Sequence, residues 1–102
     1  MPTVTVTAPP EAAGSMATTL VEERLAACVN RFPCQSVYRW DGTVNHEAEE
    51  NLLVKTTDDA YPSLVDRIHE LHPYETPAIE RSDEGHAPEA VTAWLDECVG
   101  PE

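Results

Sequence analysis

An imidazole, a phenol and a carboxylate lie close together in the segment HPYETP, residues 72–77. Neutral imidazole and carboxylate suit Cu²⁺ or Zn²⁺ better than Mg²⁺, so His72 and Glu75 are candidate metal ligands. The two prolines also admit a structural interpretation, in which they fix the exit from a helix and the entry into a strand. Tyr74 would then pack against the fold and His72 would bond to backbone. The residues alone leave both interpretations open.

Aromatic and charged side chains also alternate along a predicted hairpin. The Asp41-Gly42 pair favours a two-residue turn between strands over Val29–Trp40 and Val44–Thr56. Side chains that share a face with aromatic residues and charges are typical of protein interfaces, so we expect this face to meet another subunit. Strand alternation places on it Tyr38, Trp40, Asn45, Glu47, Glu49, Asn51, Leu53 and Lys55.

Glu49 and Lys55 are too far apart to act together within one chain. They lie six positions apart on one predicted strand, which is roughly 20 Å at about 3.3 Å per residue. A site that used both would need neighbouring subunits.

Hydrophobic periodicity predicts the elements that position these residues. Alternation over Thr3–Ala8 predicts a half-buried strand, and helical spacing predicts a helix over Glu11–Cys28. A second helix begins near Tyr61 and stops at His72-Pro73, a short strand is centred on Ala78 and Ile79, and a last helix carries Ala90 to Cys98. The order β α β β α β plus a terminal helix, with a long central hairpin, predicts an α+β fold of the ferredoxin-like, split βαβ type.

Composition limits the classes of function. The 102 residues suggest one domain over 1–102, and 6 basic against 19 acidic side chains give a net charge of −13. Binding of nucleic acid or an anionic membrane needs clustered Lys and Arg, so we exclude both partners. The charge excess leads us to expect a cytoplasm of high ionic strength, where salt screens the self-repulsion. No apolar run approaches the roughly 20 residues that span a bilayer, so we expect a cytoplasmic protein.

Catalytic motifs are missing from the sequence. It has no Gly-x-Ser-x-Gly and no phosphate-binding glycine loop, so we expect no enzyme. The three cysteines, Cys28, Cys34 and Cys98, form no Cys-x-x-Cys pair. We interpret them as reduced thiols, with no role assigned.

Six ordered segments resemble a known family. They are TAP at 7–9, LAACVN at 25–30, SVYRWDG at 36–42, LVKTT at 53–57, HPYETP at 72–77 and WL at 94–95. In this order and at these intervals the chain resembles the CutA family of divalent-cation tolerance proteins, from about Thr3 to Val99. The resemblance implies a ferredoxin-like subunit in a homotrimer, in which the long hairpin and the terminal segments extend the next subunit's sheet.

The resemblance also implies a role in tolerance of copper and other divalent cations. No enzymatic reaction is established for the family. Members in which copper binding is proposed carry a cysteine and a histidine where this chain has Val6 and Leu71. Of that set, His72 alone remains.

Two other functions follow from related folds. The trimeric PII signalling proteins share this subunit fold, which suggests a regulatory module with a small ligand between subunits, near Trp40, Glu49, Lys55 and Tyr74. Acylphosphatases use a related fold, but they need an anion-binding arginine in a glycine-rich first loop. The first loop here, residues 8–11, is proline-rich and acidic, so this function is the weakest of the three.

Overall fold

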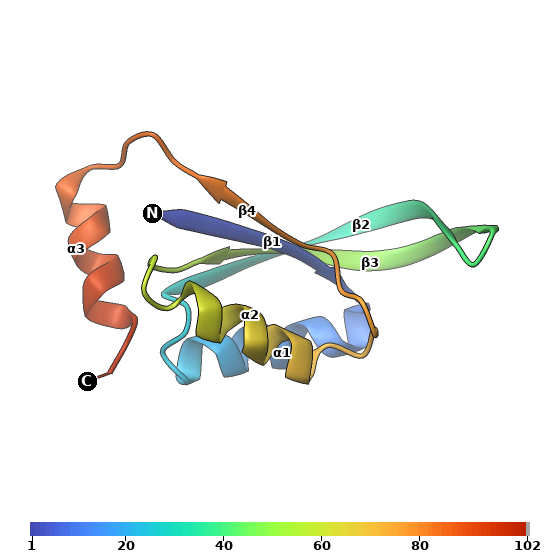
Figure 1. Cartoon of the computed structure of the whole chain (residues 1–102), viewed down its shortest axis with the longest axis horizontal. Helices are drawn as coiled ribbons and strands as arrows, with labels where there is room; N and C mark the ends of the chain where they lie inside the picture. The colour runs from blue at the N-terminus through green and yellow to red at the C-terminus, as the bar shows by residue number, and fades with distance from the viewer. Residues whose placement is uncertain (102) are drawn as a thin grey trace.

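A computed structural model describes residues 1–101 of the chain. Its seven elements over these residues follow the order predicted from the sequence, and the α+β fold class is confirmed (Figure 1). Their bounds are β1 Pro2–Ala8, α1 Pro10–Glu22, β2 Cys28–Trp40, β3 Thr43–Lys55, α2 Tyr61–Leu71, β4 Ile79–Asp83 and α3 Glu89–Cys98.

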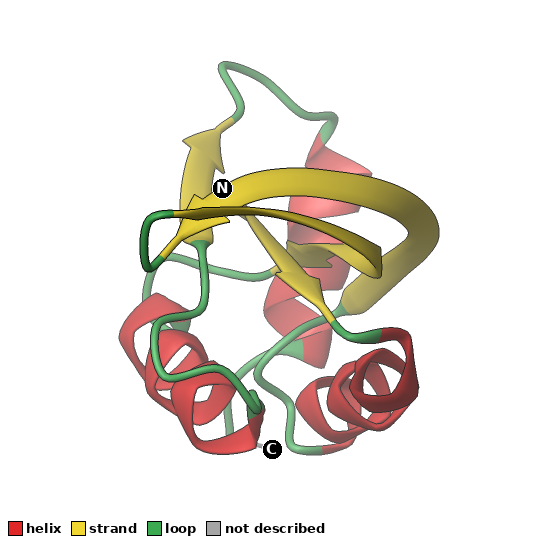
Figure 2. Cartoon of the chain, turned by 90° about the vertical axis from the view of Figure 1, so that its right-hand side faces the viewer, coloured by secondary structure: helices red, strands yellow, loops and turns green. Residues whose placement is uncertain are grey.

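The strands form one antiparallel sheet in the order β2-β3-β1-β4. Helices α1 and α2 lie side by side against one face of this sheet, whereas α3 stands at the end opposite the hairpin (Figures 1 and 2). The other face carries no helix within the described residues. β2 and β4 are the two edges, and Pro33 is tolerated in β2 because an edge strand can leave one backbone group unpaired.

The core lies between the sheet and the two helices. Val4 and Val6 of β1 pair with Val54 and Leu52 of β3, and all four point toward the helices. The threonines that alternate with them face the open side, as the sequence pattern predicts. The helices complete the core with fully buried side chains, among them Leu20, Leu64 and Ile68.

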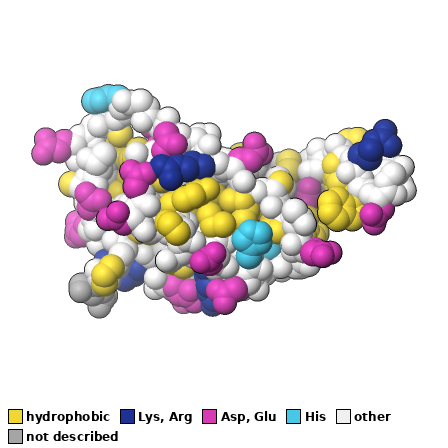
Figure 3. Space-filling model, in the orientation of Figure 1, with side chains coloured by type: hydrophobic (Ala, Val, Ile, Leu, Met, Phe, Trp, Pro, Cys, Tyr) yellow, Lys and Arg dark blue, Asp and Glu magenta, His cyan; other side chains and the backbone are white. Residues whose placement is uncertain are grey.

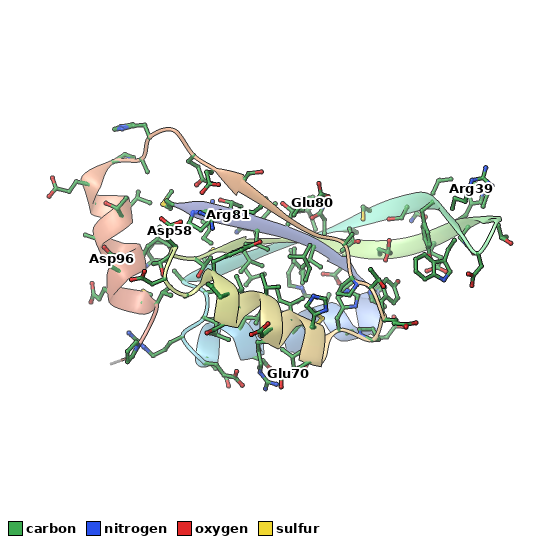
Figure 4. The ribbon with its side chains drawn as sticks, in the orientation of Figure 1. Arg39, Asp58, Glu70, Glu80, Arg81 and Asp96 are labelled. Carbon is green, nitrogen blue, oxygen red and sulfur yellow. The ribbon has the colours of Figure 1, made fainter. Side chains whose placement is uncertain are left out.

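The β2–β3 hairpin extends well beyond the core (Figure 1). Trp40 pairs with Thr43, which confirms the two-residue turn, and both Asp41 and Gly42 have positive φ, as a type I′ turn requires. β1 pairs with β3 only from Glu50 onward, so residues 34–49 project as a two-stranded ribbon with no third strand beside it. We call residues 34–49 the arm; Arg39 lies close to its tip (Figure 4).

The first helix is shorter than the spacing predicted. It ends at Glu22 rather than near Cys28, because Arg24 adopts φ 61° and the amides of Leu25 and Ala26 turn back to the Leu20 carbonyl. Cys28 therefore begins β2. The Arg24 side chain then donates to the carbonyls of Glu97 and Gly100, which ties the end of α3 to the subunit.

The other differences are small. β4 begins at Ile79, so Ala78 lies outside the strand predicted around it, and β4 continues to Asp83 because pairing with β1 satisfies its backbone. At the start of α2, the Thr57 hydroxyl accepts a hydrogen bond from the Ala60 amide. Over the described residues, no helix is both long and apolar enough to cross a membrane.

Candidate functional site

A cavity of about 670 Å³ lies where the arm leaves the core. β1 and the arm form its floor, and the segment between α2 and β4 forms a wall. The described residues that line it are Thr7, Ser36, Val37, Tyr38, Trp40, Glu49, Tyr74, Glu75, Thr76 and Ala78.

A buried carboxylate joins the floor of the cavity to its wall. Glu49 is only 4% exposed, and its Oε2 accepts a 2.8 Å hydrogen bond from the Tyr74 hydroxyl. The two residues lie 25 positions apart in sequence. This hydrogen bond fixes the ring of Tyr74 over the open face of the sheet.

Two phenols in the cavity titrate above their ordinary range. Burial, followed by the hydrogen bond to Glu49 and the negative charge of that carboxylate, raises the pKa of Tyr74. Burial and contact with Glu47 also raise the pKa of Tyr38. Both hydroxyls are therefore protonated donors at neutral pH.

His72 is held by backbone groups at both ring nitrogens. Nε2 lies 2.7 Å from the Thr7 carbonyl, and Nδ1 accepts from the Tyr74 amide at 3.1 Å. A carbonyl only accepts and an amide only donates, so this pattern fits a neutral imidazole that carries its proton on Nε2. The structural interpretation of His72, as a histidine bonded to backbone, is confirmed.

Glu75 differs from the buried His72 because its side chain is exposed, at the rim of the cavity. Its carboxylate and the ring of His72 belong to one short segment. Within residues 1–101, no three His, Cys, Asp or Glu side chains gather closely enough to hold a metal ion. The described residues of one chain therefore offer too few donors for a closed metal site.

The cavity brings together most of the candidate ligand-binding residues. Trp40, Glu49 and Tyr74 all line it, whereas Lys55 lies at the far end of β3, paired with Thr3 and Cys28. Lys55 is thus separated from the cavity within one chain, as the strand spacing predicts. Whether these side chains bind a ligand stays a prediction.

Tyr38 and Thr7 line the cavity but are not among the site residues predicted from the sequence. Strand alternation had already placed Tyr38 on the same face as Trp40 and Glu49, and that signal could have found it. Thr7, Thr76 and Ala78 carry no such signal, because the path of the α2–β4 segment across the end of β1 brings them to the cavity.

The fold and this cavity define a small ferredoxin-like subunit with a concave site at the base of a long hairpin. Comparison with known proteins then places the chain more closely. Residues 2–98 match the family described as CutA1 divalent ion tolerance protein. The chain belongs to this family, and the resemblance seen in the sequence is confirmed.

Individual relatives agree with this assignment. The chain is 46% identical over 99 residues to the divalent-cation tolerance protein CutA of Thermus thermophilus, covering 95% of this chain and 96% of that protein. The crystal structure of CutA1 from Pyrococcus horikoshii superposes with a TM-score of 0.94 at 36% identity, over 99% of this chain and 100% of that one. The PII-like protein CutA from Nostoc superposes with a TM-score of 0.90 at 35% identity, over 93% of each chain.

Proposed function

We propose that this chain forms a cytoplasmic homotrimer that contributes to tolerance of divalent cations by binding them weakly, without catalysing a reaction. The family assignment supports the role in tolerance. The cavity beside the arm carries the proposal that a bound ion or ligand sits at this end of the molecule, because the carboxylates of Glu49 and Glu75, from two separate segments, both line it.

Assembly is supported by apolar side chains on the arm that the single chain leaves in water. Trp40, on the face predicted to meet another subunit, is 54% exposed. On the opposite face of the arm, Val37 is 63% exposed and Val44 is 50% exposed. The space-filling view shows apolar atoms near the tip of the arm (Figure 3). Exposed apolar patches of this kind mark interaction surfaces. The open edges of β2 and β4 offer backbone groups that a neighbouring sheet could pair with.

We propose His72 and Glu75 as ligands for the cation, with Cu²⁺ as the first candidate. Glu75 is exposed and free to turn. His72 can coordinate through Nδ1 only if it gives up the 3.1 Å bond from the Tyr74 amide, at a cost of about 1 kcal/mol. That cost and the small donor set agree with weak binding.

Calorimetric titration with Cu²⁺ tests this site. We expect His72→Ala and Glu75→Gln each to weaken binding by about tenfold, or 1.4 kcal/mol. His86→Ala serves as the matched control, because His86 is an exposed histidine in the β4–α3 loop. Equal binding by all three variants and the wild-type chain would remove the specific site.

We also propose that the protein works at high ionic strength. The chain carries 19 acidic side chains. Only five carboxylates of residues 1–101 take part in ion pairs, and these pairs are Arg31–Glu50, Arg67–Glu23, Arg67–Glu70, Arg81–Asp58 and Arg81–Asp83.

A salt titration tests this adaptation. The Debye length falls from about 8 Å at physiological ionic strength to about 3 Å at 1 M, which screens repulsion between subunits. We expect melting temperature and assembly both to rise with salt, as measured by thermal unfolding and light scattering. A chain that is fully folded and assembled in dilute buffer would contradict the proposal.

The cavity favours a second candidate function, that of a PII-like regulatory module. Trp40, Glu49 and Tyr74 would bind a small ligand, and Lys55 would come from a neighbouring subunit. A superposable relative is itself described as PII-like. A panel of metabolites in thermal-shift assays tests this function, and a panel in which no compound raises the melting temperature counts against it.

A further inference from the structure

His72 and Tyr74 hold the segment between α2 and β4 against the end of β1. His72 is 6% exposed, and its Nε2 donates to the Thr7 carbonyl at 2.7 Å. Its Nδ1 accepts from the Tyr74 amide at 3.1 Å, and the two rings lie 4.7 Å apart. The segment passes the point where the arm leaves the core (Figure 1). The imidazole therefore fixes the backbone that carries the Tyr74 ring.

Tyr74 in turn holds the base of the arm. Its hydroxyl donates to Oε2 of Glu49, which is 4% exposed and is the last residue of the arm. Within residues 1–101, no other side-chain hydrogen bond joins the arm to the rest of the chain. Because a two-stranded ribbon has little stability of its own, this bond helps to set how the arm leaves the core. We call the contacts from Thr7 through His72 and Tyr74 to Glu49 the tether.

The tether is compatible with an assembled protein. All of its contacts are made within one chain, so a neighbouring subunit need not replace any of them. The second candidate function takes Lys55 from a neighbouring subunit. That ammonium group can join Glu49 beside the Tyr74 hydroxyl, since a carboxylate accepts about four hydrogen bonds.

His72 cannot act as a ligand while the tether is intact. It can offer a metal ion the lone pair of Nδ1 only by giving up the Tyr74 amide. It can offer Nε2 only by giving up the proton on that nitrogen and the Thr7 carbonyl. With either nitrogen, the α2–β4 segment loses a hydrogen bond that places Tyr74 beside Glu49.

We propose that cation binding at His72 and assembly through the arm oppose each other. The proposal rests on the first proposed function and adds a regulation of the same site. In the assembled protein Tyr74 bonds to both His72 and Glu49, whereas in the cation-bound chain the tether is broken and the arm loses its support. Because binding free energies at two sites are linked reciprocally, assembly weakens cation binding to the same extent. The loss of one hydrogen bond corresponds to a factor of about five.

Light scattering with and without Cu²⁺, at fixed pH and ionic strength, tests the proposal. We expect saturating Cu²⁺ to raise the concentration at which half of the chains are assembled by about fivefold or more. Neutralisation of the acidic surface would act in the opposite direction, because it reduces repulsion between subunits. Mg²⁺ is the control ion: it prefers oxygen ligands to imidazole, so it should not weaken assembly.

Two variants locate the tether. Tyr74→Phe lacks the hydroxyl that bonds to Glu49 but keeps the amide that bonds to His72. Its assembly should be weaker without Cu²⁺ and should not weaken further with it. In His72→Asn the side-chain oxygen can still accept from the amide two residues on, but the imidazole is gone. This variant should assemble and ignore Cu²⁺, and if circular dichroism shows that it is unfolded, Tyr74→Phe carries the test alone.

Tyr61→Phe is the matched control for the tether. Tyr61 packs under Arg81, outside the cavity, so the loss of its hydroxyl should leave the response to Cu²⁺ like that of the wild type. Two results would overturn the proposal. One is wild-type assembly that Cu²⁺ leaves unchanged or strengthens. The other is an equal response to Cu²⁺ in the wild type and in Tyr74→Phe.

Calorimetry with Cu²⁺ on the same samples separates failure of this proposal from failure of the proposed function. A monomeric wild type, or Cu²⁺ binding that is equal in the wild type and His72→Asn, would defeat the proposed function and this proposal with it. Cu²⁺ binding that depends on His72 in an assembled protein, with no effect of Cu²⁺ on assembly, would defeat only the opposition between the two.

Discussion

The two ends of the long β2–β3 hairpin differ in how deeply their apolar side chains are buried. At its base, Leu52 and Val54 are fully buried beneath the helices. Along the arm, by contrast, at least half of each apolar side chain is exposed: 63% of Val37, 54% of Trp40 and 50% of Val44. One continuous pair of strands, in a single unbroken register, thus has a finished core at one end and unfinished apolar packing at the other.

This contrast separates the part of the chain that stabilises its own fold from the part that we propose takes part in assembly. The base buries its apolar surface within the chain, so it folds the subunit. The apolar side chains of the arm stay largely exposed within the described residues, and we propose that a second molecule buries them. The cavity lies at the boundary between these regions, where the α2–β4 segment crosses the end of β1.

Leu64→Ala should break the base most severely. Leu64 is fully buried on α2, and the void left when such a leucine is shortened to alanine costs about 2–5 kcal/mol of unfolding free energy. Urea unfolding at fixed subunit concentration measures the loss. Val44→Ala, in the arm, should change the stability of the separated subunit by less than about 0.5 kcal/mol. Similar losses from both variants would mean that the arm packs against its own chain.

Val37→Asp should weaken association between chains through the arm without unfolding the chain. A charge placed in an apolar contact between subunits should raise the dissociation constant by about tenfold or more. Light scattering reports the mass, and circular dichroism checks the fold. The control is Val21→Asp, on a 42% exposed valine of α1 that lies outside the arm. Unchanged mass for the Val37 variant, or equal dissociation of both, would contradict an interface on the arm.

Tyr74→Phe should have the smallest effect, and one that depends on pH. At pH 7 the variant loses the hydrogen bond to Glu49, worth about 1 kcal/mol. Burial raises the folded-state pKa of Tyr74 above its unfolded value near 10, so its stabilisation is fully present below about pH 10 and is lost as pH rises further. The difference between wild type and variant should therefore shrink at alkaline pH.

Urea unfolding at neutral and alkaline pH measures that difference. Tyr61→Phe is the control, because Tyr61 packs under Arg81 and lies outside the cavity. If the wild type and Tyr74→Phe lost stability in parallel above pH 10, the hydrogen bond between Tyr74 and Glu49 would not contribute to the free energy of unfolding.

Local sequence patterns predicted most of the fold. The alternation over Thr3–Ala8 gave the right strand and the right faces, and Asp41-Gly42 gave the right turn and hence the whole hairpin register. The predicted end of α1, at Cys28, was wrong. Apolar spacing continues past Glu22, whereas the positive φ of Arg24 stops the helix. Helical periodicity says nothing about a contact between Arg24 and the carbonyls of Glu97 and Gly100 at the end of α3.

The candidate site was predicted in part. Pattern placed Trp40 and Glu49 on one face, and the HPYETP segment drew attention to Tyr74 and Glu75. Nothing in the pattern could show that Tyr74 reaches across 25 residues to Glu49, or that backbone groups occupy both nitrogens of His72.

The sequence by itself determined the alternation of faces, the hairpin turn, the acidic charge and the family, because each depends on residue types at short or ordered spacing. Only the tertiary structure decided which carboxylate is buried, which backbone groups occupy the nitrogens of His72 and where a cavity opens. Those properties arise where segments distant in sequence meet, and the meeting depends on how strands twist and loops cross rather than on any local preference.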